Sequence, residues 1–391
     1  MVDIAGRAVA AARRARRGQP GTHALIIGVS RYRHLEGGPA ESERGLSWEM
    51  GQLSAAAASA SQVAGWLATR YHNPDAPLAT LRVLLSPQPD ETLDPQIARH
   101  VRAARHRATR KNVEAALAAF RDDVARDPRN TAFVYIAGHG VQLTRDDTIV
   151  LLEDVGDPAH LTMLHGAIDA AGCHAGMAAP VIPATQFWFI DACRQRPQIA
   201  ERFERLPGAL TLDRPLTEPV SPCYLAAGRQ ELAFARPGER TLFCEALLDA
   251  LDGGVSDGPT ATCPSWYVSS YSLYRYLKET VGKLASEDGE VQTVFLKGDP
   301  SDGVVHRLPA PPRVALRVEL RPQAAAGVTS ASLLLDARIP VRRVPRRWPL
   351  VMRLPAGLYL LNLKTRAPFK EASRILDLVP PSLALEAEVL P

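Results

Sequence analysis

The chain has 391 residues, enough for two domains, and its 46% apolar and 23% charged residues are typical of a folded globular protein. No run approaches eighteen consecutive apolar residues, so we expect no membrane-spanning helix. The five cysteines contain no CxxC pair, which argues against a disulfide framework and against a zinc ribbon. They favour a reducing compartment, and we therefore expect a cytoplasmic protein without a metal or other cofactor.

The net charge of +4 is distributed unevenly along the chain. Five Arg against one Asp give residues 1–20 a charge of +4, and we expect a basic tail over residues 1–21. Thirteen basic against two acidic residues give residues 307–370 a charge of +11, whereas residues 21–306 carry about −8. The basic region is compatible with docking to the acidic part, with a separate partner, or with a solvated surface. Its arginines have few aromatic neighbours, so the pattern does not favour nucleic-acid binding.

Strands and helices alternate over the first half of the chain. Apolar runs of strand length predict strands over residues 23–29, 81–85, 131–137, 148–152 and 185–191. Apolar spacing of three and four predicts helices over residues 53–70, from a capping Thr109 to about residue 124, and over residues 164–178. Residues 86–108 show no period and predict a long surface loop. This alternation predicts an α/β fold with a mostly parallel sheet and helices on both faces.

The alternation of strands and helices stops at residues 194–220, which are rich in Arg and Pro and predict an exposed connection. An apolar segment follows over residues 223–227, and apolar spacing predicts helices over residues 241–251 and 271–285. Beyond Pro309 the pattern changes to short alternating strands, over residues 314–320, 332–335, 350–354, 357–363 and 375–378. We therefore expect a main domain over residues 22–308 and a small all-β, sandwich-like domain over residues 309–391.

A histidine and a cysteine each follow a predicted strand. His139 lies in the segment Tyr135–Gly140, and Cys193 lies in the segment Phe189–Arg194, 54 positions later. Because the carboxyl ends of parallel strands share one edge of a sheet, the two side chains can meet there, as a thiolate nucleophile and its imidazole base require. The backbone N–H groups of Gly140 and Cys193 are candidates for stabilising an oxyanion. The reaction that fits is acyl transfer to cysteine followed by hydrolysis.

Each residue also has a simpler interpretation. A lone cysteine after a strand is more often a small core residue than a nucleophile, and a histidine in a Gly-His-Gly turn is usually structural. The presence of both residues, each after a strand and at this spacing, favours the catalytic interpretation.

Three segments together resemble the caspase-like cysteine peptidases, in particular the prokaryotic relatives of caspases and metacaspases. They are residues 24–32, the Ala-Gly-His-Gly turn and the Phe-Ile-Asp-Ala-Cys-Arg segment. The similarity extends over about residues 22–300. It implies a caspase-hemoglobinase fold, a His139–Cys193 dyad, an oxyanion hole from the amides of Gly140 and Cys193, and a protein substrate.

The resemblance also bears on specificity. Caspases have glutamine two positions before the nucleophile, whereas metacaspases have an aspartate that pairs with a substrate arginine or lysine. This chain has Asp191, which implies cleavage after Arg or Lys, and Glu231 is a candidate second carboxylate of the pocket. Metacaspases place a further pocket aspartate where this chain has Ser59, which leaves the pocket less negative. The alternative for Asp191 is a strand-end residue that orients a loop.

The arginines of the predicted connection and the family resemblance bear on how the activity is regulated. The predicted connection contains arginines at positions 194, 196, 202, 205 and 214, and an enzyme that cleaves after basic residues could cut itself there. The alternative is a surface loop that stays uncut. Prokaryotic relatives that look similar act in regulated proteolysis, including defence and cell death. The resemblance therefore implies a zymogen-like enzyme that is controlled by an activating or regulatory protein. The alternative function is a catalytically silent, caspase-shaped interaction module whose basic C-terminal domain binds a partner.

Overall fold

The computed structural model describes residues 18–43, 50–101, 103–143, 147–162, 164–177, 185–194, 221–228, 232–236, 238–261, 263–298, 303–336 and 348–391, and the backbone of 339–344. The chain divides into two compact units, one made of Met1–Leu248 with Tyr274–Val305, the other of Asp249–Leu273 with His306–Pro391. Residues 1–17 of the expected tail, residues 195–220 of the expected connection, and Glu231 lie outside the described residues.

Among the described residues, a six-stranded sheet in the order β10-β8-β7-β3-β1-β2 forms the centre of the first unit. Its strands are β1 (Thr22–Val29), β2 (Leu78–Ser86), β3 (Thr131–Gly138), β7 (Thr185–Ala192), β8 (Cys223–Leu225) and β10 (Phe295–Lys297). Every neighbouring pair from β2 to β8 is parallel, and β10 joins β8 antiparallel. The predicted mostly parallel sheet is confirmed.

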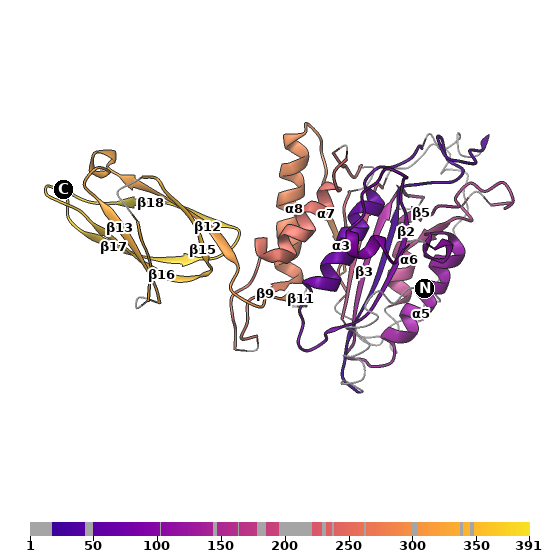
Figure 1. Ribbon diagram of the computed structural model, residues 1–391, viewed down its shortest axis with the longest axis horizontal. Helices are drawn as coiled ribbons and strands as arrows, with labels where there is room; N and C mark the ends of the chain where they lie inside the picture. Colours follow the sequence, from indigo (N-terminus) through magenta and orange to yellow (C-terminus); the bar gives the residue numbers. More distant parts are fainter. Residues whose placement is uncertain are drawn as a thin grey trace. The chain divides into compact units, whose positions relative to one another are not determined.

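Helices cover both faces of this sheet, which explains why its central strands are mostly apolar on both faces. All eight residues of β1 are buried. Figure 1 shows α3 (Ala56–Thr69) and α7 (Leu242–Asp249) on one face, and α5 (Arg110–Val124) and α6 (Ala170–Gly176) on the other. The predicted stripe of α5, with members at 113, 117, 120 and 124, is buried in the core of its face.

Two predictions for this region need correction. Thr109 precedes α5, but its side chain makes no cap hydrogen bond; instead, both carboxylate oxygens of Asp154 accept from the N–H of Arg110, at 3.0 and 3.1 Å. The loop predicted over residues 86–108 contains two short helices, α4 (Pro95–Ala98) and the 3-10 helix η1 (Ala104–His106). Asp94 begins α4 by accepting from two of its backbone N–H groups.

The helix predicted over residues 164–178 is also only partly correct. Its first part is the strand β6 (Ala167–Asp169), and the helix α6 occupies the rest. A small antiparallel sheet joins β6 to β5 (Ile149–Leu151), and β5 to β4 (Gly140–Val141). This sheet holds the chain that leaves His139.

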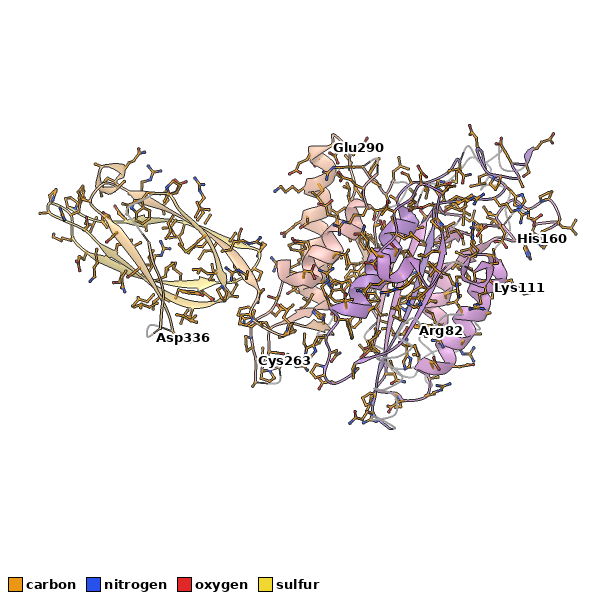
Figure 2. The ribbon with its side chains drawn as sticks, viewed as in Figure 1. Arg82, Lys111, His160, Cys263, Glu290 and Asp336 are labelled. Atoms are coloured by element: carbon orange, nitrogen blue, oxygen red, sulfur yellow. The ribbon has the colours of Figure 1, made fainter. Side chains whose placement is uncertain are left out.

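Charged residues also tie α5 to the sheet. Arg82 belongs to β2 (Figure 2), and its guanidinium donates to the carboxylate of Asp123 on α5. Since the side chains of both residues are mostly buried, the pair fixes the position of the helix across the edge strand.

The C-terminal segment is all-β, as predicted. One sheet has the order β15-β12-β18 and the other has the order β14-β13-β16-β17. The strands are β12 (Arg313–Arg321), β13 (Ser330–Leu335), β14 (Ile339–Val344), β15 (Leu350–Pro355), β16 (Gly357–Lys364), β17 (Ala372–Leu378) and β18 (Ser382–Glu388). Alternate side chains of both sheets meet in one apolar core, which includes Leu316, Leu333 and Leu361. The pattern missed β14 and β18, and β18 runs parallel to β12.

The remaining elements connect these parts of the chain. α8 (Ser270–Glu287) confirms the helix predicted over residues 271–285. The end of α7 continues into a π-helical turn, η3 (Ala250–Gly254). Short segments complete the chain: β9 (Tyr267–Ser269), β11 (Val304–Arg307) and the 3-10 helix η4 (Gln323–Ala325).

Neither a membrane span nor a metal cluster occurs in the part of the chain that the structure describes. None of the helices there combines the length and apolar character needed to cross a bilayer. Within the same residues, no group of three or more His, Cys, Asp or Glu side chains could hold a metal ion.

The close approach of α3 to β1 gives a test of the packing. A Cβ atom at Gly28 would lie 2.5 Å from the Cβ of Ala60 and 2.9 Å from the Cα of Ala57. Gly28→Ala should therefore lower the free energy of unfolding by about 1–3 kcal/mol, measured by urea denaturation. Gly282→Ala on α8 is the control, because its nearest neighbour would be 3.8 Å away, and it should leave stability unchanged or raise it. Equal stabilities would contradict the packing of α3 on β1.

Candidate active site

The pairing of β3 with β7 brings His139 and Cys193 to the same edge of the sheet. The two strands are parallel and in register along their whole length, and their last pair is Gly138 with Ala192. His139 and Cys193 are the next residues of their chains, so they emerge side by side from strands about 4.8 Å apart. Both side chains are partly exposed. The structure thus places the two predicted residues side by side at one edge of the sheet.

A backbone carbonyl orients the imidazole of His139. The Nε2 atom lies 2.9 Å from the carbonyl oxygen of Gly51, which can only accept a hydrogen bond. Nε2 therefore carries the proton, and Nδ1 is the unprotonated nitrogen of the neutral ring. Burial lowers the pKa of His139, although the bond to Gly51 opposes this shift. The neutral form, with Nδ1 as a base, is favoured at neutral pH.

Tyr32 fixes the backbone at the same residue. Its hydroxyl accepts a hydrogen bond from the His139 N–H at 2.6 Å and donates to the carbonyl of Val29 at 3.2 Å. Its ring lies against the imidazole, with the ring centroids 4.9 Å apart. Tyr32 is fully buried, so it links the end of β1 to the turn that carries His139.

Gly140 packs directly against the backbone of Cys193. A Cβ atom at this position would lie 2.1 Å from the carbonyl oxygen of Cys193 and 2.9 Å from the Cβ of Ala192. No other residue fits here without moving the backbone of the cysteine. The close approach explains the second glycine of the Gly-His-Gly turn, and it brings the backbone of Gly140 next to that of Cys193.

The thiol of Cys193 differs from the other four thiols of the chain. Cys173, Cys223, Cys244 and Cys263 are buried, whereas Cys193 is partly exposed. Cys263, labelled in Figure 2, belongs to the second unit. Its Sγ atom accepts a hydrogen bond from the N–H of Ala233 at 3.3 Å. Burial raises the pKa of the Cys193 thiol, the Ala233 N–H lowers it, and the charge of Asp191 raises it again. The net increase keeps the thiol protonated at rest.

Asp191 is buried beneath this edge. Its Oδ2 atom accepts from the hydroxyl of Tyr135 at 2.5 Å and from the hydroxyl of Thr241, while Oδ1 is buried without a hydrogen-bond partner. Burial raises the pKa of Asp191 to about 6, and the bonds from Thr241 and Tyr135 partly offset this. Asp191 thus holds Tyr135 and Thr241 through one carboxylate oxygen and keeps the other without a partner.

Ser59 belongs to the same cluster. Its hydroxyl accepts from the N–H of Thr241 at 3.0 Å, and its carbonyl accepts from the thiol of Cys244. Where the metacaspase pattern has a second aspartate, this chain therefore has a neutral hydroxyl that holds the start of α7. The carboxylate of this cluster is that of Asp191, and Glu231 lies outside the described residues.

Several groups of the site were not predicted from the sequence, and one residue lies elsewhere than predicted. Gly51 and Ala233 act through backbone atoms, so no residue type signals them, whereas the aromatic Tyr32 stood within the recognised motif without a role. Arg194 was expected in an exposed segment, but it is 4% exposed, and its guanidinium lies 6.0 Å from the centroid of the Phe295 ring. It is therefore not an accessible cleavage site.

A cysteine and a histidine side by side at one edge of a parallel sheet is an arrangement that a cysteine peptidase can use. Residues 22–262 match the family described as the caspase domain, and the chain belongs to this family of cysteine peptidases. The crystal structure of caspase-1 from Spodoptera frugiperda is similar at 11% sequence identity, with a TM-score of 0.42, over 74% of this chain and 89% of that chain. No curated protein matches the chain.

The buried Asp191 makes stability depend on pH. Its pKa of about 6 in the folded state exceeds the unfolded value near 3.9, so the folded state loses stability as pH rises through this range. Asp191→Asn removes the titration, and the variant should gain roughly 1–3 kcal/mol relative to wild type between pH 4.5 and pH 7.5 in urea denaturation.

Asp127→Asn is the control for this measurement. Asp127 is partly exposed, and the hydrogen bond from the Arg129 side chain lowers its pKa to about 2, below the range tested. The stability difference between this variant and wild type should therefore be constant from pH 4.5 to pH 7.5. A constant difference for Asp191→Asn as well would show that the Asp191 carboxylate bears no burial cost.

Proposed function

We propose that this protein is a cysteine endopeptidase in which His139 and Cys193 form the catalytic dyad and which cleaves after Arg or Lys. The observation that carries the proposal is the register of β3 with β7, which ends both strands level at these two residues. The bond from His139 Nε2 to Gly51 supports it, because it leaves Nδ1 free as a base.

Both groups are neutral at rest, so the chemistry begins with a proton transfer. The Cys193 thiol gives its proton to Nδ1 of His139 as Sγ forms a bond to the scissile carbonyl carbon. The N–H groups of Gly140 and Cys193 stabilise the oxyanion, each by about 3 kcal/mol. The imidazolium then gives the proton to the leaving amine as the C–N bond breaks. Water, deprotonated by the same imidazole, hydrolyses the resulting thioester.

The unused oxygen of Asp191 supports a preference for a cationic residue before the scissile bond. A buried carboxylate oxygen without a partner is costly, and a guanidinium or ammonium supplies the missing donor and charge. Since the pKa of Asp191 is about 6, its charge is present above that pH and lost below it. Cleavage after Arg should therefore weaken below about pH 6.

A cavity of about 600 Å³ beside this cluster agrees with a basic substrate. It is lined in part by Ala58 and Arg240, the sequence neighbours of Ser59 and Thr241. Four carboxylates also line it, those of Asp90, Glu91, Glu239 and Glu245. Arg240 and Arg236, which pairs with Glu239 and Glu245, offset part of this charge, and the remaining negative charge favours a basic peptide.

The dyad predicts the behaviour of single variants. Fluorogenic peptides ending in Arg or Lys should be cleaved faster than those ending in Asp, and Cys193→Ala and His139→Ala should each lower kcat/KM by at least about a hundredfold. Cys263→Ala removes a buried thiol from the second unit and should cleave normally. Wild-type protein that cleaves no peptide, with or without calcium and candidate activators, would favour the silent interaction module instead.

Self-cleavage within residues 194–220 is the proposed route of activation, in keeping with a zymogen. Wild-type protein should yield fragments by intact mass after incubation, cut after Arg196, Arg202, Arg205 or Arg214, because a basic preference recognises these residues. Cys193→Ala should remain intact. The same fragments from both proteins would indicate a contaminating protease, and no fragments from either would exclude self-processing.

The C-terminal strands are proposed to serve recognition or control by a regulatory protein. This role rests on the basic residues over 307–370 and on the position of the strands beyond the caspase domain. Cytoplasmic activity, and a part in defence or cell death, belong to the same proposal.

A further inference from the structure

A buried glutamine connects the strand of the nucleophile to the segment that contacts its sulfur. Gln292 lies between α8 and β10, and it is 2% exposed. Its Nε2 atom donates to the carbonyl of Ala226 at 2.9 Å, and its Oε1 atom accepts from the N–H of Phe234 at 3.0 Å. One side chain thus joins two stretches of backbone that are otherwise separate in the sequence.

Both ends of this link lead to Cys193. Ala226 follows β8, and its N–H donates to the carbonyl of Ile190 on β7, three residues before the nucleophile. Phe234 follows Ala233, whose N–H donates to Sγ of Cys193. The hydrogen bonds therefore run from the strand that carries the cysteine, through the Gln292 amide, to the segment that meets its sulfur.

Other contacts hold the far end of the 232–236 segment. The carbonyl of Phe234 accepts from the N–H of Leu242 at 3.0 Å, and Arg236 forms an ion pair with Asp288 at 2.9 Å. These contacts fasten the segment to α7 and to the end of α8. Gln292 ties the segment to the end of β8 through the Ala226 carbonyl.

We propose that Gln292 is a positioning residue, which holds the 232–236 segment so that the Ala233 N–H stabilises the Cys193 thiolate as it forms. The inference rests on the proposed function, since it assigns Gln292 to the same nucleophile. The amide suits the task because one partner is a carbonyl and the other an N–H, so the position needs one donor and one acceptor. A carboxylate supplies no donor, whereas a protonated carboxyl supplies both.

This difference gives a test that depends on pH. Gln292→Glu should behave like wild type when its carboxyl is protonated, and it should lose the bond to the Ala226 carbonyl when the carboxyl ionises. Burial and the facing carbonyl raise the pKa of such a carboxyl, which brings its titration into the accessible range. The printed contacts of Gln292, the Ala226 carbonyl and the Phe234 N–H, do not titrate. Tyr32 and Asp191, which interact electrostatically with Cys193, and His139 on the neighbouring strand end are the same in the variant and in wild type.

The main readout is the rate at which iodoacetamide alkylates Cys193, followed by mass spectrometry from pH 5.5 to pH 8.5 in the full-length chain. The ratio of the Gln292→Glu rate to the wild-type rate should be near one at pH 5.5 and fall to about one tenth at pH 8.5, as the thiolate loses its N–H donor. Gln292→Met, which is similar in length but makes neither bond, should be slow throughout. The kcat/KM ratio for an Arg peptide should follow the same pH course.

Gln186 provides a matched control on β7. It is also buried, its amide donates to the carbonyl of Met177, and its carbonyl accepts from the indole of Trp188. Gln186→Glu should lower the unfolding free energy in a similar way but leave the alkylation ratio constant with pH. A Gln292→Glu ratio that is constant, or that rises with pH, would overturn the inference. Because alkylation needs no turnover, it tests Gln292 even if the proposed peptidase activity is not found.

Discussion

The in-register pairing of β3 with β7 is the constraint on which the site depends. A slip of one residue would move Cys193 along its strand by about 3.3 Å, more than the length of a hydrogen bond. Apolar packing prevents the slip, since Phe133 and Phe189 lie with ring centroids 5.0 Å apart on neighbouring strands. The position of the nucleophile relative to His139 is therefore set by the core of the sheet, because each residue follows directly from a strand that the core holds.

The loops contribute through their backbones. The carbonyl of Gly51 orients His139, the N–H of Ala233 contacts Cys193, and the only side chain that fastens the histidine turn directly is Tyr32, as far as the described residues show. Backbone groups are available in any sequence, so the site depends on where each loop is held rather than on which residues it contains. This makes the residues that anchor the loops as important for geometry as those that face the substrate.

Much of the sheet could be predicted because its strands are buried on both faces, and the two site residues because each directly follows such a strand. The contacts of Gly51 and Ala233 could not be predicted, since backbone atoms leave no signature in residue type. The expected cap of α5 at Thr109 is wrong because Asp154 accepts from the N–H of Arg110, and Asp154 lies 44 positions further along the sequence. Residues 164–178, rich in Ala and Gly, fit a helix or a strand locally, and pairing with β5 decided for β6.

The electrostatics of the edge link substrate binding to the nucleophile. Burial lowers the pKa of His139 and raises the pKa values of Asp191 and Cys193, which favours the neutral form of each group. The charge of Asp191 raises the pKa of Cys193 further. A substrate cation beside Asp191 Oδ1 would compensate that charge, lower the pKa of the carboxyl and remove its opposition to a thiolate. Under the proposed function, a basic side chain therefore favours formation of the nucleophile as well as binding, whereas a neutral side chain in the same place leaves the thiol protonated. Selectivity would then appear in kcat as well as in KM, because the cation acts on the charge that develops during attack.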